Sequence, residues 1–306
     1  MTAGDEGPNA GGFGHTGRMT MVIWADGRLV EQGQGALSAV DHGITVGDGV
    51  FETCTVFDGQ AFALTRHLAR LGRSARGLGL ESPDEQKVRD GVTAVLDEAV
   101  RGGGPFDGRL RITVTAGVGP LGSGRTPGAQ TVVVAAQESA MAPTSRSARS
   151  PWTRNEHSAV AGLKTTSYAE NVVALADAVS KGGDESIFAN TVGQLCEGTG
   201  SNVFVERGGE LVTPPLEAGC LAGITRALLL EWGAEAGLPV REAEPDELPF
   251  TVLDEVALGE AQLLLTSSGR NVQPVTWLDG ADVPVGELSA AARELFEKLC
   301  RDRLDP

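Results

Sequence analysis

The sequence is poor in lysine and has almost no tyrosine. Its 306 residues include four lysines and a single tyrosine, Tyr168. The lysines are Lys87, Lys164, Lys181 and Lys298. Chemistry that needs a side-chain amine therefore has only four candidates, and chemistry that needs a phenol has one.

Basic residues are also scarce overall. The chain carries 41 acidic and 25 basic residues, which gives a net charge of −16 at pH 7. Such a surface repels phosphate backbones, so we expect no nucleic-acid partner. No apolar run approaches the roughly 20 residues of a membrane span. Residues 1–18 are glycine-rich without an apolar run, which predicts a disordered leader rather than a signal peptide, and we expect a cytoplasmic protein.

The four cysteines form no C-x-x-C pair and follow no regular spacing. This pattern favours reduced, buried thiols over a disulfide framework or a zinc site, and we expect no metal. The length fits two packed domains better than one core. A segment rich in Ser, Pro and Arg at 141–150 predicts a linker between an N-terminal domain over 19–140 and a C-terminal domain over 151–306.

The N-terminal half predicts hairpins followed by two helices. Asp-Gly turns at 26–27 and 58–59 separate alternating strand patterns. Apolar residues recur at helical spacing over 64–78 and 88–100, and Ser82 is the predicted N-cap of the second helix. Two further strands are predicted over 110–115 and 131–136.

The C-terminal half mixes helices and short strands. Helices are predicted from about 168 to 181, from near 223, and over 288–299. Strands are predicted over 185–188, 202–206, 211–213 and 262–266. The predicted fold class is α+β in two domains.

A glycine-rich motif at Gly117–Gly122 matches the G-x-G-x-x-G pattern of dinucleotide-binding folds, and Glu138 follows about 20 residues later. In such a fold a helix must follow the glycines. Here Gly124, Pro127 and Gly128 come next and a strand is predicted after them, so no crossover helix fits. We interpret the segment as a loop between strands.

Among the four lysines, only Lys164 lacks a surface explanation. The other three fall on the polar sides or the ends of predicted helices. Lys164 stands between 161–163 and 165–167, where the pattern predicts no solvated face. A lysine in such a place is costly unless it is neutral or covalently engaged, as in a Schiff base. Taken alone, the position is explained better by a lysine whose stem is merely buried.

The residues that follow Lys164 change that interpretation. Tyr168 comes four residues later, within reach of a cofactor on the lysine, and Glu197 precedes a turn of small residues. Gly223–Arg226 is a glycine turn that enters a helix and presents free N–H groups to a phosphate, and Thr266–Gly269 is a second hydroxyl-rich turn. One lysine, one carboxylate and two phosphate-binding turns are what pyridoxal phosphate requires.

With these motifs in order, the chain resembles the fold-type IV pyridoxal-phosphate enzymes, which are branched-chain and D-amino-acid aminotransferases, (R)-selective amine transaminases and aminodeoxychorismate lyases. The resemblance covers nearly everything from about Met21 onward and rests on the segments 47–53, 67–71, 164–171, 183–185, 197–204 and 219–226. It implies a smaller N-terminal α/β domain and a larger C-terminal domain with a β-barrel-like core and helices. It also implies a homodimer whose active site lies between the domains and is completed by a loop from the second subunit.

The resemblance implies a role for each matching residue. Lys164 would form the internal aldimine and move the proton at the substrate's α-carbon, Glu197 would face the pyridine nitrogen, and Tyr168 would hydrogen-bond the ring phenolate oxygen. The residues that match phosphate contacts are Arg70, Ile224, Thr225 and Thr266, with Ser201 expected near the ring or the phosphate.

The substrate is less well determined. D-amino-acid aminotransferases would have an arginine after Val114-Thr115, where this chain has Ala116. Arg125, between flanking glycines, is a candidate ligand for the substrate carboxylate, Arg111 and Arg28 are further candidates, and Phe51 is a candidate substrate contact. The expected reaction moves an amino group between an amino acid (D- or branched-chain, with (R)-amines also open) and a 2-keto acid. The alternative is an aminodeoxychorismate lyase that yields 4-aminobenzoate and pyruvate, and a non-catalytic relic is disfavoured because Lys164 and Glu197 are intact.

Overall fold

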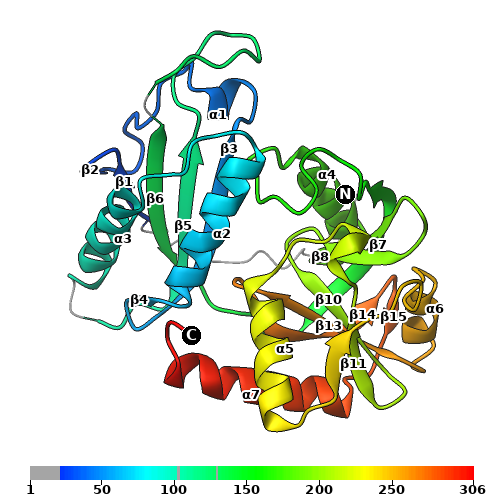
Figure 1. The fold of residues 1–306 in the computed structure, drawn as a ribbon. Helices are drawn as coiled ribbons and strands as arrows, with labels where there is room; N and C mark the ends of the chain where they lie inside the picture. Colours follow the sequence, from blue (N-terminus) through cyan, green and yellow to red (C-terminus); the bar gives the residue numbers. More distant parts are fainter. Residues whose placement is uncertain (1–20, 102–103, 129) are drawn as a thin grey trace, which may run out of the picture.

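The computed structural model describes residues 21–101, 104–128 and 130–306. The predicted leader over 1–18 therefore lies outside the described residues. The described chain forms two sheets with helices around them, one built from the N-terminal half and one from the C-terminal half (Figure 1).

The N-terminal sheet has six strands in the order β2-β1-β6-β5-β3-β4, and every neighbouring pair is antiparallel. Its strands are β1 (Met21–Ala25), β2 (Arg28–Val30), β3 (Gly49–Phe57), β4 (Gln60–Ala61), β5 (Gly108–Thr115) and β6 (Thr131–Glu138). The two predicted hairpins are confirmed. Asp26 and Asp58 adopt the left-handed backbone that these tight turns require, and a glycine follows each.

Two helices, α2 (Leu64–Gly77) and α3 (Glu85–Val100), pack on one face of this sheet, and the short α1 (His42–Thr45) precedes β3. Leu110, Ile112 and Val114 of β5 point into the core beneath the helices. Because side chains alternate along a strand, Arg109 and Arg111 project from the opposite face. The predicted cap at Ser82 is wrong. Asp84 caps α3 instead, since its carboxylate accepts from the backbone N–H groups of the first turn.

The C-terminal sheet has nine strands, in the order β12-β11-β10-β13-β14-β7-β8-β9 with β15 paired to β14. They are β7 (Ser145–Arg154), β8 (Glu185–Asn190), β9 (Leu195–Gly198), β10 (Asn202–Arg207), β11 (Glu210–Thr213), β12 (Val240–Glu242), β13 (Gln262–Ser267), β14 (Asn271–Leu278) and β15 (Ala281–Asp282). The Gly198 N–H donates to the Ser201 carbonyl over 2.7 Å, so the last strand, β9, returns beside β10. The sheet therefore curls on itself.

Helices surround the C-terminal sheet. They are α4 (Ala169–Ser180), α5 (Ile224–Ala236), α6 (Val252–Ala257) and α7 (Glu287–Asp302), with a 3-10 turn η1 at Leu216–Ala218. After α7 the chain returns to the base of α2 (Figure 1), where Thr65 Oγ1 donates to Asp305 over 2.6 Å. Phe62 of the N-terminal half packs edge-on against Trp232 and Phe296, which joins the two halves through one apolar cluster.

The predicted linker at 141–150 is mostly not a linker, because 145–154 form β7 in the middle of the C-terminal sheet. The polar composition did not reveal this strand, because serines occupy several of its buried positions. Ser145 and Ser147 are buried, and Ser145 donates to Asp184 over 2.5 Å, whereas Arg146 and Arg149 reach outward to carbonyl and carboxylate partners.

All four cysteines are unpaired and buried, and their predicted burial is confirmed. Among the described residues, no helix combines the length and the apolar character that crossing a bilayer requires.

Candidate active site

A cavity of about 1180 Å³ lies between the two halves of the chain. Its N-terminal wall includes the face of β3 and β5 that the helices leave uncovered. Its C-terminal wall is formed by the segment before α4, the turn between β9 and β10, the start of α5 and the turn after β13. Every residue that the sequence predicted for the cofactor lines this cavity: Arg70, Lys164, Tyr168, Glu197, Ser201, Ile224, Thr225 and Thr266.

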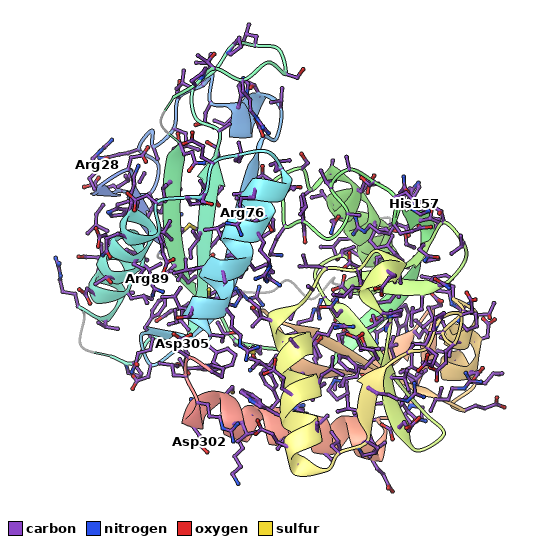
Figure 2. All side chains as sticks on the ribbon, viewed as in Figure 1. Arg28, Arg76, Arg89, His157, Asp302 and Asp305 are labelled. Atoms are coloured by element: carbon purple, nitrogen blue, oxygen red, sulfur yellow. The ribbon has the colours of Figure 1, made fainter. Side chains whose placement is uncertain are left out.

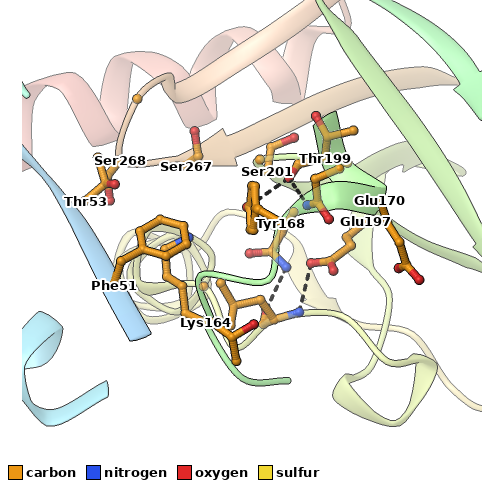
Figure 3. A pocket seen from close by; sticks show the side chains of 18 of the residues that line it. Phe51, Thr53, Lys164, Tyr168, Glu170, Glu197, Thr199, Ser201, Ser267 and Ser268 are labelled. Carbon is orange, nitrogen blue, oxygen red and sulfur yellow. Dashed lines mark hydrogen bonds between the residues drawn. The ribbon is translucent and has the colours of Figure 1, made fainter. Parts of the chain in front are cut away.

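Lys164 lies deep in the cavity, behind the ring of Phe51 in Figure 3. Its carbonyl accepts from the Phe51 N–H over 3.0 Å, and its N–H donates to Ser74 Oγ over 3.2 Å, so the backbone is fixed from two sides. The Nζ atom lies 4.3 Å from the centre of the Phe51 ring and has no hydrogen bond among the described residues. Burial, together with the charge of Arg70, lowers the pKa of Lys164 to about 8.

Glu197 occupies the opposite side of the cavity from β3. Its Oε2 accepts from the Leu221 N–H over 2.9 Å, and its Oε1 lies 3.3 Å from Nε of Arg154. Burial raises the pKa of Glu197, and Arg154 acts against that rise. The carboxylate is thus fixed at both oxygens and placed to meet a cation or a protonated ring nitrogen in the cavity.

Tyr168 stands between Lys164 and Glu197 in Figure 3. Its hydroxyl donates to the carbonyl of Thr199 over 3.0 Å, and its ring packs edge-on against Phe51 at 5.3 Å. The hydroxyl proton is therefore already used by the protein. Donation from Tyr168 to a cofactor oxygen would require that bond to Thr199 to open.

The turn that carries Thr199 is held by a buried carboxylate that the sequence analysis overlooked. Glu185 accepts from the N–H and hydroxyl of Thr199 and, over 2.9 Å, from the hydroxyl of Ser201. The amide of Asn171 also donates to the Thr199 carbonyl. The hydroxyl proton of Ser201 is thus committed to Glu185, which leaves its lone pairs to face a ligand.

The start of α5 has the groups that bind an anion. Gly223 is the N-cap and offers no side chain, and no side chain among the described residues caps this helix N-terminus. A Cβ at Gly223 would overlap the Asn202 side chain, which explains why glycine stands there. Thr225 lies in the first turn, and Oγ1 of Thr266 is buried with no hydrogen-bond partner in the described part of the chain. Free N–H groups and an unpartnered hydroxyl are what a phosphate group would satisfy.

Arg70 reaches the cavity from α2 but is already tightly held. Its Nε and Nη2 donate to Glu52 over 2.8 and 2.7 Å, and its Nη1 donates to the Ala222 carbonyl over 3.0 Å. Glu52 is fully buried, and the neighbouring His67 places Nδ1 2.7 Å from it. Although burial opposes ionisation, the Arg70 charge lowers the pKa of Glu52 to about 2. Two N–H groups of Arg70 stay available to an anion.

Of the three arginines that the sequence predicted as candidates to bind a substrate carboxylate, one lines the cavity and two do not. Arg125 does not line the cavity; it forms a two-point ion pair with Asp48 at 2.6 and 2.7 Å and donates to two backbone carbonyls. Arg28 lies on β2, at the edge of the N-terminal sheet that faces away from the C-terminal half (Figure 2). Arg111 lines the cavity, with its guanidinium 3.7 Å from the centre of the Phe51 ring.

Comparison with known proteins places these features in context. The family model described as Amino-transferase class IV matches residues 49–278. A Methanocaldococcus jannaschii protein named as a branched-chain-amino-acid aminotransferase is 31% identical over 91% of this chain and 96% of its own length. A bifunctional aminodeoxychorismate lyase / D-amino acid transaminase of Mycobacterium tuberculosis is 30% identical over 90% of this chain and 98% of its own. Among solved structures, a fold IV-transaminase from Curtobacterium pusillum superposes with a TM-score of 0.77 at 30% identity, covering 90% of this chain and 97% of that one.

Proposed function

The chain belongs to the class IV aminotransferase family, a family of pyridoxal-phosphate enzymes with fold type IV, and from that premise we propose that the cavity around Lys164 is its transaminase active site. One observation carries the proposal. A lysine amine with a pKa of about 8 and no hydrogen-bond partner among the described residues shares a single cavity with the fixed carboxylate of Glu197.

The residues present fit pyridoxal phosphate. The phosphate would take the uncapped N-terminus of α5 at Ile224 and Thr225, the unpartnered hydroxyl of Thr266, and the spare N–H groups of Arg70. Glu197 would face the pyridine nitrogen. The phosphate and the ring nitrogen of the cofactor would thus each have partners of complementary charge in the cavity.

When bound, the cofactor supplies a ring that accepts the electrons released at the substrate's α-carbon. Lys164 supplies the base, and because its pKa is about 8, a share of the amine is neutral near neutral pH and can take the proton at Nζ. The ammonium that results can return that proton to a neighbouring carbon. Glu197 would keep the ring nitrogen protonated, and Tyr168, fixed by its bond to Thr199, would form the wall of the site between Lys164 and Glu197.

The substrates are an amino acid and a 2-keto acid. We propose that Arg111 binds the α-carboxylate, because it lines the cavity and has no carboxylate partner among the described residues. Phe51, whose ring lies under both Arg111 and Lys164, would hold the substrate between them. D-amino acids, branched-chain amino acids and (R)-amines are all candidates as donors, since the names of the relatives include the first two classes.

Aminodeoxychorismate lyase is the second candidate function. The bifunctional relative carries both activities in its name, and the same lysine and ring environment can serve elimination as well as transamination. Release of pyruvate from aminodeoxychorismate without turnover of any amino acid would favour the lyase.

We further propose that the chain acts as a homodimer in the cytoplasm. Val172, Val173 and Val179 are exposed together on α4, beside the cavity, and such an apolar surface suits a second copy of the chain. Light scattering of the purified protein tests the dimer, and substitution of Val173 by Asp should shift it toward monomer.

The test of the active site is spectroscopic. Protein purified with pyridoxal phosphate should have visible absorbance from the lysine-bound cofactor, and Lys164→Ala should lack it while Lys87→Ala keeps it. Single-turnover bleaching with L-amino acids, D-amino acids and (R)-amines then identifies the donor class. An unchanged spectrum in Lys164→Ala would exclude Lys164 as the attachment site.

A further inference from the structure

A short segment after α7, residues 303–306, connects the two halves of the molecule, and we call it the strap. It leaves α7 in the C-terminal half and ends beside the start of α2 in the N-terminal half, where Figure 2 labels Asp305. The side chain of Leu304 packs on the apolar cluster that contains Phe62, Trp232 and Phe296. The strap is therefore anchored by apolar contact and not only by surface charges.

The strap caps the start of α2. Ala63, the N-cap residue of this helix, has a left-handed backbone and a methyl side chain that accepts no hydrogen bond. Its N–H donates to the Leu304 carbonyl over 2.7 Å. The Thr65 N–H donates to one carboxylate oxygen of Asp305 over 2.9 Å, and Thr65 Oγ1 donates to the other over 2.6 Å. A carboxylate at this end of a helix satisfies N–H groups of the first turn and complements the helix dipole.

The strap also holds α5. Arg303 donates to Glu235 on α5 over 2.7 Å. Arg66, in the first turn of α2, donates to the backbone oxygen of Pro306 over 2.8 Å and, from both Nη atoms, to Glu231 on α5 over 2.8 Å. Exposed ion pairs are individually weak, but these share one short segment and one apolar anchor. The two helices are thus linked to each other, and each is linked to the strap.

These two helices supply the groups that would bind the phosphate of the cofactor. Arg70 lies on α2, about one and a half turns beyond the capped residue Thr65, and Ile224 and Thr225 begin α5. Arg70 Nη1 donates to the Ala222 carbonyl over 3.0 Å, next to the start of α5. The placement of the arginine relative to the helix N-terminus therefore depends on how α2 sits against α5.

We propose that Asp305 is a positioning residue for the phosphate site, because through the strap it fixes α2 against α5. This inference rests on the proposed function, in which Arg70 and the start of α5 bind the phosphate. Asp305 does not line the cavity, so it acts on the cofactor only through the two helices. A change at Asp305 should weaken binding of the phosphate group and leave the bond between the cofactor and Lys164 nearly unchanged.

Two probes separate the phosphate from the rest of the cofactor. Pyridoxal 5′-phosphate and pyridoxal can both react with Lys164, but only the first carries the phosphate, so the ratio of their dissociation constants isolates the phosphate site. Holoenzyme formed with each compound is brought to equilibrium by dialysis, and bound cofactor is measured by its visible absorbance. Asp305→Ala should raise the dissociation constant of pyridoxal 5′-phosphate by about 3- to 30-fold, the range for loss of one helix cap, and leave that of pyridoxal within about twofold.

Asp84→Ala is the matched control. Asp84 caps α3, which packs on the same face of the N-terminal sheet as α2, but none of the described residues of α3 lines the cavity. Both variants should lower the urea midpoint of unfolding, whereas only Asp305→Ala should change the ratio. Asp305→Asn keeps an oxygen for the Thr65 N–H and should recover most of the ratio. Arg303→Gln removes the ion pair with Glu235 and should change the ratio in the same direction as Asp305→Ala.

The inference is overturned if Asp305→Ala lowers the urea midpoint with an unchanged ratio, or if it weakens binding of the two compounds equally. If Asp305→Ala does not fold, Thr65→Val, which removes the hydroxyl donor and keeps the carboxylate, is measured in its place, and an unchanged ratio there overturns the inference as well. Failure of the proposed function would look different, because neither compound would give the wild type the visible absorbance of a lysine-bound cofactor.

Discussion

Lys164→Met should stabilise the cofactor-free protein, because the wild-type lysine is held where its charge is costly. Burial lowers the pKa of Lys164 from 10.5 to about 8. One pKa unit corresponds to about 1.4 kcal/mol, so the cost to the folded state is at most about 3 kcal/mol at neutral pH. Methionine has nearly the same shape and carries no charge. The free energy of unfolding should therefore rise by about 1–3 kcal/mol, since part of the amine surface faces the cavity.

The sign of the pH dependence follows from the same shift. Between pH 8 and 10.5 the unfolded chain binds a proton at Lys164 that the folded chain has released, so wild-type stability rises with pH across this window. The gain in free energy of unfolding of Lys164→Met over the wild type is then complete below pH 8 and disappears above pH 10.5.

Urea denaturation of cofactor-free wild type and variant at pH 7 and at pH 10.5 measures the effect. Lys87→Met is the matched control: Lys87 Nζ contacts Asp26 over 2.7 Å on the surface, so its loss should cost about 0.2–1 kcal/mol. A Lys164→Met variant that is less stable than the wild type at pH 7 would refute the assignment of Lys164 as a strained buried amine. The assignment would also be refuted if the variant and the wild type differed in free energy of unfolding by the same amount at both pH values.

Three other changes test the surroundings of the site. Glu52→Gln leaves the Arg70 charge without its carboxylate and should lower the free energy of unfolding by about 3–5 kcal/mol in urea at pH 7. Because the pKa of Glu52 is about 2, the deficit should shrink only as the pH falls below 4.5, and a deficit that is constant from pH 7 to pH 3 would argue against this pairing. Tyr168→Phe removes one hydrogen bond and should cost about 1 kcal/mol while the visible spectrum is retained; loss of bound cofactor would show instead that the hydroxyl is essential to it. Arg125→Ala breaks the ion pair with Asp48 and should speed proteolysis of the 117–128 loop with KM for amino acids unchanged, whereas a raised KM would place Arg125 at the substrate after all.

Turns and helices whose structure depends on residues close together in the sequence were predictable. Asp-Gly pairs specify tight turns because the aspartate and glycine both accept positive φ, and both turns are found as predicted. The helical spacing over 64–78 corresponds to α2, whose apolar face meets β3 in the core. The N-cap of α3 was ambiguous because two residues near its start can cap a helix. Ser82 and Asp84 both suit the start of α3, and the carboxylate, which reaches two N–H groups, is the one used.

Features that depend on distant partners were not predictable in this way. The Ser- and Arg-rich stretch that forms β7 looks like a linker because its partners, β14 and β8, come from segments far along the chain. Glu52 and Glu185 are likewise acids in otherwise ordinary strands. Only the fold shows that Glu52 meets Arg70 and that Glu185 meets Thr199. Lys164 was singled out because the three other lysines had surface explanations. The ion pair of Arg125 with Asp48 was not foreseen because the two residues are distant in sequence.

The distribution of charge links these observations to the substrate. The chain as a whole carries −16, yet six basic side chains and four carboxylates line the cavity. The carboxylates lie among the paired arginines, so the positive charge left over is concentrated on Lys164, Arg109 and Arg111. A negative surface slows the approach of an anion, whereas this local excess binds it once it has entered. Recognition of an anionic substrate must therefore come from a few fixed positions inside the cavity, and the arginines of β5 that have no carboxylate partner among the described residues are two of these positions.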